Sequence, residues 1–209
     1  WKRKRFAGAN YREDHRKWYL GDSVSAGIGQ GYTAFTPLQL AHATATLAND
    51  GVAFRPHLVK QVENLRTGEV TRIAAESTHT LAVSKEHIEV IRNALVGVNR
   101  EGTSRRAFDG AKYVSGGKTG TAQVFSLKGE KYDASKIDER LRDHAWFMAY
   151  APADRPRIAV AVLVENGGFG AQAAAPIARQ VFDFYLLGDR APSAAPLAPG
   201  APDPDDQSD

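Results

Sequence analysis

Four consecutive residues, Lys118-Thr119-Gly120-Thr121, bring a cation, two hydroxyl groups and a glycine together in a stretch of strand-like sequence. Acyl transfer on a peptide with a free terminal carboxylate needs groups of these kinds. A cation and hydroxyl donors bind the carboxylate, backbone N–H groups stabilise the developing oxyanion, and glycine lets a peptide approach the backbone closely. The motif therefore predicts a site for chemistry at the carboxyl end of a peptide.

Strand geometry decides which of these groups can act together. Thr119 and Thr121 would project from the same face, because alternate side chains of a strand point the same way. Their hydroxyls could then hold the carboxylate, and the Thr121 N–H could point at the scissile carbonyl of a peptide lying antiparallel to the strand. Lys118 has the other parity, so its side chain must bend to reach the same place. Alone, however, a Lys-Thr-Gly tripeptide is also typical of an exposed turn.

Two helices and a hairpin are expected before the motif. The first helix covers residues 37–51, opens with a capping box and stops at a glycine. The second begins near Ser84, a favourable N-cap, and ends near Gly102. Its predicted core-facing stripe repeats at helical spacing: Ile88, Ile91, Leu95 and Val98. Between the helices, short strand-like pieces flank Thr67-Gly68 in residues 52–82, which predicts an exposed hairpin.

Three strands and a final helix complete the expected domain. The strands cover residues 113–124, 145–151 and 158–164, and their order favours an antiparallel meander. The helix covers residues 173–187, and its buried stripe is predicted at Ile177, Val181, Phe184 and Tyr185. This pattern predicts an α+β fold, in which helices pack on an antiparallel sheet.

Four segments have the composition of loops or tails. Residues 1–19 carry seven Lys and Arg against two acids, with five aromatics, which fits either a solvated loop with its aromatics tucked into the domain or a nucleic-acid-binding stretch. Residues 21–36 are rich in Gly, Ser and Thr and predict a loop, but they lack the ending of a phosphate-binding loop. Residues 125–143 predict a long exposed connection. The Pro-, Ala- and Asp-rich residues 189–209 predict a disordered tail.

Composition excludes several other classes of chemistry. The 209 residues include no cysteine, so disulfides, thiolate metal sites and a cysteine nucleophile are ruled out. The six histidines are scattered without metal-ligand spacing, and neither a metal nor a cofactor is predicted. A net charge of +3 is too small to imply a nucleic-acid partner. No apolar run approaches the roughly 20 residues that cross a bilayer.

The string SGGKTGTAQVF at residues 115–125 resembles the class B penicillin-binding proteins, in which Lys-Thr-Gly is one of three active-site signatures. Four further segments resemble regions of the same class, in the same order: residues 27–51, 140–152, 158–170 and 174–186. The opening segment Trp1–Phe6, Gly21-Asp22 and Tyr32 are similar to the elongation type, penicillin-binding protein 2. The resemblance identifies residues 1–188 as the C-terminal portion of a transpeptidase domain of the fold shared with serine β-lactamases, with residues 1–35 as a loop-rich entry segment.

This resemblance implies a peptidoglycan D,D-transpeptidase that cross-links stem peptides by serine acyl transfer at D-Ala-D-Ala and is acylated by β-lactams. Lys118 and Thr121 are implied to be catalytic, and Thr119, Gly120 and Thr121 are implied to bind the substrate. The family also implies a bacterial inner-membrane protein with this domain on the periplasmic side. Its implied partners are a membrane glycosyltransferase and other proteins of the elongation complex.

The chain departs from the family in its nucleophile signatures. Its one Ser-x-x-Lys, Ser115–Lys118, overlaps the strand motif, and two glycines disfavour the helix N-terminus that the nucleophile needs. No Ser-x-Asn occurs in the sequence. No nucleophile is therefore assigned within this chain, which is expected to form one wall of the active site and to be inactive alone.

Several readings stay open at this point. A β-lactam-sensing receptor would use the same scaffold, a D,D-carboxypeptidase would use the same chemistry, and a non-catalytic interaction domain would use neither. By the resemblance, Asp143-His144 opens a strand and is expected to be structural, while Ser126 borders the cleft as a candidate peptide contact. The alternating aromatic residues of the strand at 145–151 are interpreted as core: Trp146, Phe147 and Tyr150.

Overall fold

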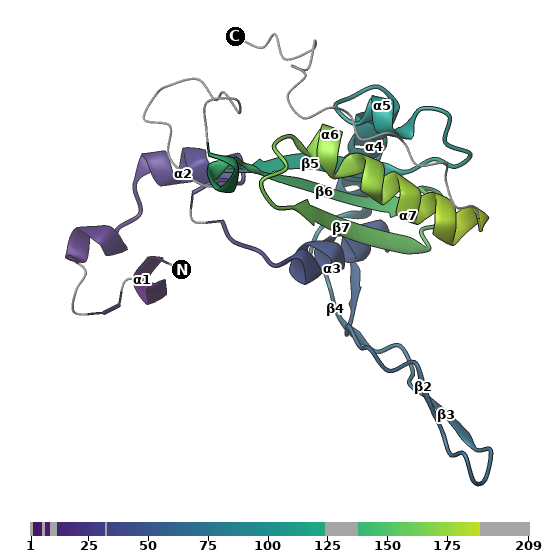
Figure 1. Cartoon of the computed structure of the whole chain (residues 1–209). Coiled ribbons are helices and arrows are strands. Elements are labelled where there is room, and N and C mark those ends of the chain that lie inside the picture. The colour runs from purple at the N-terminus through teal and green to yellow at the C-terminus, as the bar shows by residue number, and fades with distance from the viewer. Residues whose placement is uncertain (1, 6, 9–11, 32, 124–137, 189–209) are drawn as a thin grey trace. The chain divides into compact units, whose positions relative to one another are not determined.

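The computed structural model describes residues 2–5, 7–8, 12–31, 33–123 and 138–188. The chain divides into two compact units, Trp1–Thr36 and Pro37–Asp209. The second unit contains the sheet and the motif at residues 118–121, and so it positions the candidate chemistry (Figure 1).

The first unit is organised around a buried lysine. Its elements are α1 (Lys2–Arg5), the 3-10 helix η1 (Glu13–Arg16) and α2 (Leu20–Gly27). Lys2 is only 6% exposed and donates hydrogen bonds to the Asp22 carboxylate at 2.6 Å and to the Lys17 carbonyl at 2.8 Å. Its ammonium group also lies 5.9 Å from the ring centre of Trp18 and 5.2 Å from that of Tyr19. Paired charge and aromatic faces therefore offset the cost of burying this cation.

Helix α2 was not expected, because the composition of residues 21–36 predicts a loop. The Asp22 carboxylate accepts the Tyr19 N–H at 2.8 Å and so satisfies an otherwise unpaired donor at the helix start. The hydrogen bond from Lys2 holds the pKa of Asp22 below its usual range. This contact spans 20 residues of sequence, which a local composition pattern cannot reveal. Trp18 and Tyr19 stay about half exposed, so these two aromatics are not tucked into a core.

Three antiparallel strands form the sheet of the second unit in the order β5-β6-β7. Their bounds are Gly116–Ala122 for β5, His144–Ala151 for β6 and Ile158–Val164 for β7. Thr119 of β5 lies opposite Phe147 of β6, which lies opposite Val162 of β7. The meander predicted from the sequence is thereby confirmed.

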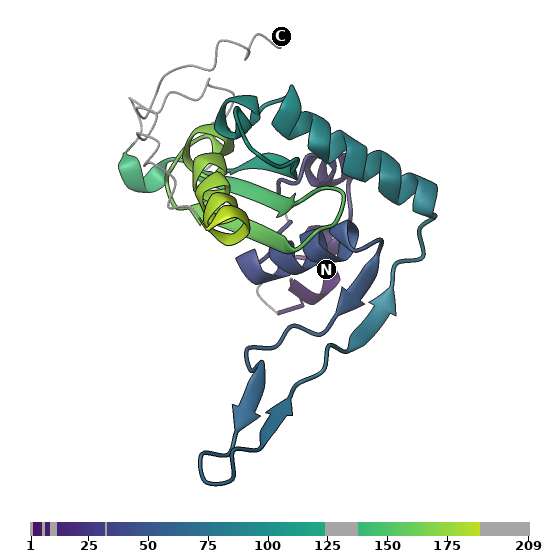
Figure 2. The same ribbon diagram turned by 90° about the vertical axis from the view of Figure 1, so that its right-hand side faces the viewer.

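Helices cover both faces of this sheet (Figures 1 and 2). Two of them, α3 (Pro37–Ala48) and α4 (Lys85–Arg100), pack on one face, and α6 (Gly170–Ala173) and α7 (Ala175–Leu187) pack on the other. The short helix α5 (Arg105–Phe108) joins α4 to the lead-in of β5 and contacts α7. The α+β fold with helices on an antiparallel sheet is therefore confirmed.

Strand β6 contributes alternate residues to two separate cores. Phe147 is completely buried with Phe108 and Phe182 on the α7 side. Tyr150 is 1% exposed and packs with Leu95 of α4 on the other side. The alternation follows from the two-residue period of a strand. Phe147 and Tyr150 are thus core residues, as predicted, whereas Trp146 is only half-buried.

The buried stripe predicted for the last helix is wrong. The residues expected in the core are exposed on α7: Ile177, Val181, Phe184 and Tyr185. The face that meets the sheet instead carries small residues and one aromatic: Ala175, Ala178 and Phe182. Both sets repeat at helical spacing, so periodicity alone could not choose between them. Alanines let the helix approach the sheet closely, and Phe182 fills the remaining space.

In α4 the predicted stripe is only partly buried, because Ile91 is 44% exposed.

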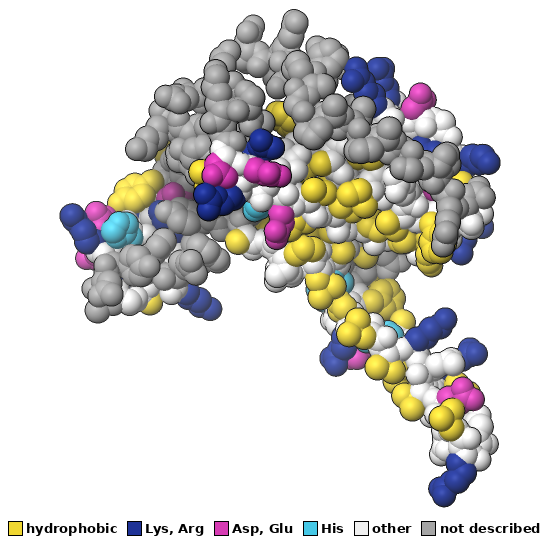
Figure 3. Space-filling view, viewed as in Figure 1, with side chains coloured by type: hydrophobic (Ala, Val, Ile, Leu, Met, Phe, Trp, Pro, Cys, Tyr) yellow, Lys and Arg dark blue, Asp and Glu magenta, His cyan; other side chains and the backbone are white. Residues whose placement is uncertain are grey.

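The segment that joins α3 to α4 in the chain forms a hairpin arm that extends away from the sheet (Figures 1 and 2). The arm contains two successive pairs of short strands, made from β1 (Val52–Phe54), β2 (Gln61–Glu63), β3 (Val70–Arg72) and β4 (Ser77–Thr80). Strand β1 pairs with β4 and β2 with β3, as the predicted hairpin requires. Apolar side chains are exposed along it, Leu58 and Leu65 most of all (Figure 3).

Two sequence predictions lie largely or wholly outside the described residues. The tail at 189–209 is one of them, and the connection at 125–143 is described only from residue 138 onward, where the 3-10 helix η2 covers Glu139–Leu141. Among the helices that the structure describes, none combines the length and the apolar character needed to span a membrane.

Candidate active site

The motif at residues 118–121 lies in an edge strand. Strand β5 pairs with β6 on one side, and within the described ranges no strand pairs with its other side. Lys118 is exposed, while Thr119, Gly120 and Thr121 are half-buried. The motif is therefore an extended strand, as the sequence predicted, and Lys118 is exposed in the part of the chain that the structure describes.

Lys118 bends back over its own strand. Its ammonium group donates to the Thr119 carbonyl at 2.8 Å and lies 3.4 Å from the Thr119 hydroxyl oxygen. The opposite parity of Lys118 is thus overcome by its flexible side chain, which brings the cation to the threonine hydroxyl. Such a cation beside a hydroxyl is suited to binding an anion.

The Thr119 carbonyl also shows how the backbone of β5 is oriented. A carbonyl that accepts from the exposed Lys118 side chain points away from β6, toward the outer edge. In an antiparallel strand the N–H and C=O groups of residues two apart point to the same edge. The N–H of Thr121 therefore points to the outer edge too, where an incoming peptide could lie.

Beneath the start of β5 lies a chain of buried polar side chains. Asn99 of α4 donates to the Ser115 hydroxyl at 2.9 Å and accepts from the Ser104 hydroxyl at 2.6 Å. All three are at most 5% exposed. Ser115, which the sequence argued against as the nucleophile, is thus a buried hydrogen-bond partner of Asn99. Because buried polar groups must be satisfied, these hydrogen bonds among Asn99, Ser104 and Ser115 fix the end of α4 against the beginning of β5.

Two glycines allow close packing around the motif. A Cβ atom at Gly117 would lie 2.6 Å from the Phe147 ring and 3.0 Å from Asn99 Oδ1. A Cβ atom at Gly170, the first residue of α6, would lie 2.2 Å from the Trp146 carbonyl oxygen and 2.7 Å from that of Gly120. These positions are therefore restricted to glycine, and α6 is held directly against the strand that carries the motif. Sequence reasoning missed Gly170, because only the packing of α6 against β5 and β6 shows what this residue touches.

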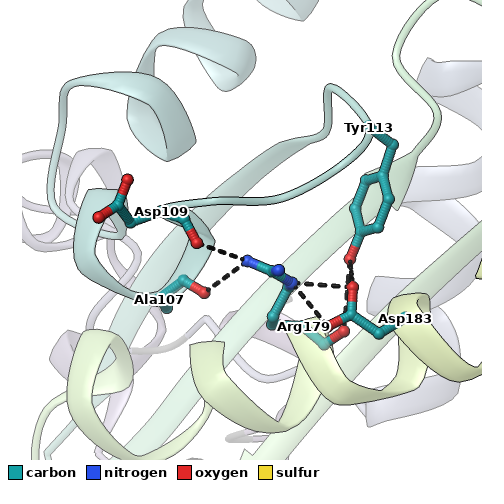
Figure 4. Close-up of polar contacts among 5 residues, drawn as sticks. All are labelled: Ala107, Asp109, Tyr113, Arg179 and Asp183. Carbon is teal, nitrogen blue, oxygen red and sulfur yellow. Dashed lines mark hydrogen bonds and ion pairs between the residues drawn. The ribbon is translucent and has the colours of Figure 1, made fainter. Parts of the chain in front are cut away.

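A second polar cluster holds the lead-in of β5 (Figure 4). The Arg179 Nε donates to both carboxylate oxygens of Asp183, at 2.8 and 2.9 Å, and its Nη1 donates to the Asp109 carbonyl at 3.1 Å. The Tyr113 hydroxyl donates to Asp183 at 2.8 Å. Helix α7 is thereby tied to the end of α5 and to the residues that precede β5.

The free energy of unfolding should fall as the pH rises above about 10. Burial, followed by the hydrogen bond to Asp183, raises the pKa of Tyr113 above that of an unfolded tyrosine. Burial also raises the pKa of Tyr150. Above about pH 10 the unfolded chain loses these protons while the folded protein keeps them, so each group contributes a negative slope of at most ~1.4 kcal/mol per pH unit.

Urea unfolding measured between about pH 8 and 11 tests this slope, and Tyr113→Phe should make it shallower, since it removes one of the two groups. The slope is the relevant quantity, because the substitution also removes a hydrogen bond at every pH. Equal slopes for the two proteins would contradict the assignment to Tyr113.

The residues at the start of β6 make contacts within the fold. His144 begins β6 and accepts the backbone N–H of Asn166 through Nδ1 at 2.9 Å, and Asp143 is buried with its carbonyl accepting from Gly168. These contacts fit a structural role. Ser126 lies outside the described residues. In the part of the chain that the structure describes, no group of three His, Asp or Glu side chains could hold a metal ion.

Comparison with known proteins bears on this geometry. Residues 6–183 match the family model for the penicillin binding protein transpeptidase domain. The chain is 44% identical over 190 residues to the peptidoglycan D,D-transpeptidase MrdA of Haemophilus influenzae, an alignment that covers 89% of this chain and 28% of that protein. The chain thus spans less than a third of the length of this relative.

Solved structures show the same fold. The imipenem acyl-enzyme complex of penicillin-binding protein A from M. tuberculosis matches with a TM-score of 0.63 at 32% identity, covering 78% of this chain and 33% of that one. The complex between penicillin-binding protein 2 and MreC from Helicobacter pylori matches with a TM-score of 0.65 at 27% identity, covering 90% and 30%. The family match extends through the edge strand and both helical layers, so the chain belongs to the penicillin-binding protein transpeptidase domain family.

Proposed function

We propose that this chain is the C-terminal part of an elongation-type peptidoglycan D,D-transpeptidase resembling penicillin-binding protein 2. One observation carries the proposal: an accessible edge strand presents the Lys118 ammonium beside the Thr119 hydroxyl. The similarity to a relative named peptidoglycan D,D-transpeptidase MrdA supports the reaction class.

Each residue of the motif has a separate task in this proposal. Lys118 and the hydroxyls of Thr119 and Thr121 bind the terminal carboxylate of the stem peptide. The Thr121 N–H, on the outer edge of β5, stabilises the oxyanion. Gly120 leaves room for the peptide backbone to lie along the strand, as in strand addition.

The reaction needs a serine that this chain does not supply. The serine oxygen adds to the carbonyl carbon of the penultimate D-Ala, the amide C–N bond breaks, and the terminal D-Ala leaves as an amine that takes the serine proton. An amine of a neighbouring stem peptide then displaces the serine oxygen, forms the new amide and returns a proton to the serine. A β-lactam follows the first step and leaves the serine acylated. The term "longer protein" denotes this chain within a protein of the relatives' full length, of which the chain covers 28% in the MrdA alignment.

The proposed setting is the periplasmic side of the bacterial inner membrane. A membrane glycosyltransferase and other elongation proteins are the proposed partners, and nucleic acid is not among them. The solved complex of the Helicobacter pylori relative with MreC supports a partner of the elongation kind.

Labelling with a fluorescent penicillin tests the proposed function. The longer protein should become covalently labelled, and peptide mapping should place the adduct on a serine outside residues 1–209, whereas this chain alone should stay unlabelled. An adduct on Ser115 or any other serine of this chain would contradict the proposal, as would failure of the longer protein to react.

A product assay separates the remaining functions. With a D-Ala-D-Ala peptide and an amine acceptor, a transpeptidase yields the cross-linked product, and a carboxypeptidase yields the shortened peptide. A β-lactam receptor would be acylated and yield neither product.

A further inference from the structure

A hydroxyl group outside the motif contacts its central threonine. Thr103 lies in the turn between α4 and α5, and its Oγ1 is 3.0 Å from Oγ1 of Thr119. This contact joins residues that are 16 positions apart in the sequence. No sequence motif distinguishes Thr103, and only the packing of α4 on β5 brings it to the site.

The neighbouring residue fixes the position of Thr103. Ser104 is 1% exposed, its hydroxyl donates to Asn99 Oδ1 at 2.6 Å, and its backbone N–H donates to the Val98 carbonyl at 3.3 Å. Thr103 itself is exposed on the turn. The buried contacts of Ser104 therefore hold the backbone of the turn in place. The Thr103 hydroxyl itself lies outside the core, beside β5.

Counting protons shows what this contact can do. A threonine hydroxyl has one proton to donate and two lone pairs to accept with. Lys118 can only donate, and its ammonium lies 3.4 Å from the Thr119 oxygen. If Thr103 also donates to Thr119, both lone pairs of Thr119 are engaged. The single proton of Thr119 must then be given to a third group.

The opposite direction would work against an anionic ligand. If Thr119 gave its proton to Thr103, it could offer a carboxylate only lone pairs, and a carboxylate accepts hydrogen bonds but cannot donate them. We propose that Thr103 is a positioning residue, which donates to Thr119 and so turns the Thr119 O–H toward the substrate carboxylate. This inference rests on the proposed function and adds to it a residue that sets the direction of one hydrogen bond.

Acylation kinetics of the longer protein test the inference with two probes, benzylpenicillin and its methyl ester. The ester lacks the carboxylate charge but retains the reacting amide. Thr103→Val keeps the shape of the side chain without its hydroxyl and should slow acylation by benzylpenicillin about 10-fold, the equivalent of one lost hydrogen bond to a charged ligand. Acylation by the ester should change by less than about 2-fold, because the oriented proton has no carboxylate to meet.

Two further variants serve as controls. Thr103→Ser retains the hydroxyl and should react with benzylpenicillin as the unaltered protein does. Thr71→Val makes the same substitution at an exposed position on β3, and it should leave both rates unchanged. Because Thr103 is exposed, the midpoint of thermal unfolding should be nearly the same for all of these proteins.

Each contrary outcome has a distinct meaning. If Thr103→Val slows both probes equally, Thr103 supports the strand generally and the inference is overturned. If it slows neither probe, the contact has no role and the inference is again overturned. If the unaltered longer protein reacts with neither probe, the proposed function fails, and the inference that depends on it fails too.

Discussion

Replacing Lys118 with alanine should slow acylation of the longer protein by benzylpenicillin about 10- to 100-fold, the equivalent of one lost hydrogen bond between charged groups. Lys118 is the cation of the motif, and its ammonium lies within 3.4 Å of the Thr119 hydroxyl that is proposed to bind the carboxylate. Its loss removes both the attraction for the carboxylate and a donor to Thr119. The rate constant at limiting probe concentration is the quantity to measure.

The fold should tolerate this substitution. Lys118 is exposed, and its ammonium contacts the carbonyl and the hydroxyl of the adjacent Thr119. The midpoint of thermal unfolding should therefore stay close to that of the unaltered protein, because surface substitutions rarely change stability by more than about 0.5 kcal/mol. A loss of activity accompanied by a large drop in that midpoint would indicate damage to the fold instead.

Two variants show whether charge alone explains the effect. Lys118→Arg keeps the charge but replaces a compact ammonium with a larger planar group, so it should recover only part of the rate. Lys112→Ala removes the same charge from an exposed position before β5, and it should alter the rate by less than about 2-fold, since the charge of a solvated side chain outside the motif is largely screened by salt. A rate that does not change in Lys118→Ala would remove the main support for the proposed function.

The motif could be read from the sequence because its chemistry is local. Strand parity places Thr119 and Thr121 together, and the length of the lysine side chain allows Lys118 to join them. The sheet order followed from three strand-like segments in succession, and the arm at residues 52–82 followed from its turn residues. These features depend on residues that are near one another in the chain.

The remaining features depend on contacts between distant segments. Thr103, in the turn between α4 and α5, and Gly170, at the start of α6, both contact the motif. The sequence around each of them does not predict this contact. The hydrogen bond from Lys2 to Asp22, in the first turn of α2, also joins residues that are far apart in the sequence. On α7 two apolar stripes compete, and the packing of Phe182 against Phe108 decides between them. Periodicity measures amphipathic character but not which neighbour a face will meet.

Breaking the ion pair between Arg179 and Asp183 should cost more stability than any other substitution considered. Arg179→Met should lower the free energy of unfolding by about 3 kcal/mol, because it leaves a buried carboxylate without its cation. The side chains are only 18% and 10% exposed, so water can replace the lost partner poorly. The Arg179 contacts to the Ala107 and Asp109 carbonyls disappear as well.

Replacing both members of the pair together should nevertheless cost much less than the two single changes combined. Arg179→Met combined with Asp183→Leu removes both charges and fills the space with apolar atoms, which for buried pairs is often close to neutral. The double variant should therefore be more stable than the sum of the two single changes by at least about 2 kcal/mol. Calorimetric unfolding of the four proteins gives this coupling energy directly.

An exposed pair provides the matched comparison. Arg100 and Glu101 lie 3.2 Å apart with side chains 71% and 69% exposed, and Arg100→Met should cost less than about 0.5 kcal/mol. If Arg179→Met cost no more than this, the cluster shown in Figure 4 would not be holding α7 to the lead-in of β5. If it does cost more, the longer protein that carries Arg179→Met should also react more slowly with benzylpenicillin. The Tyr113 hydroxyl bonded to Asp183 lies three residues before the strand that carries Lys118, so loosening the cluster loosens the approach to the motif.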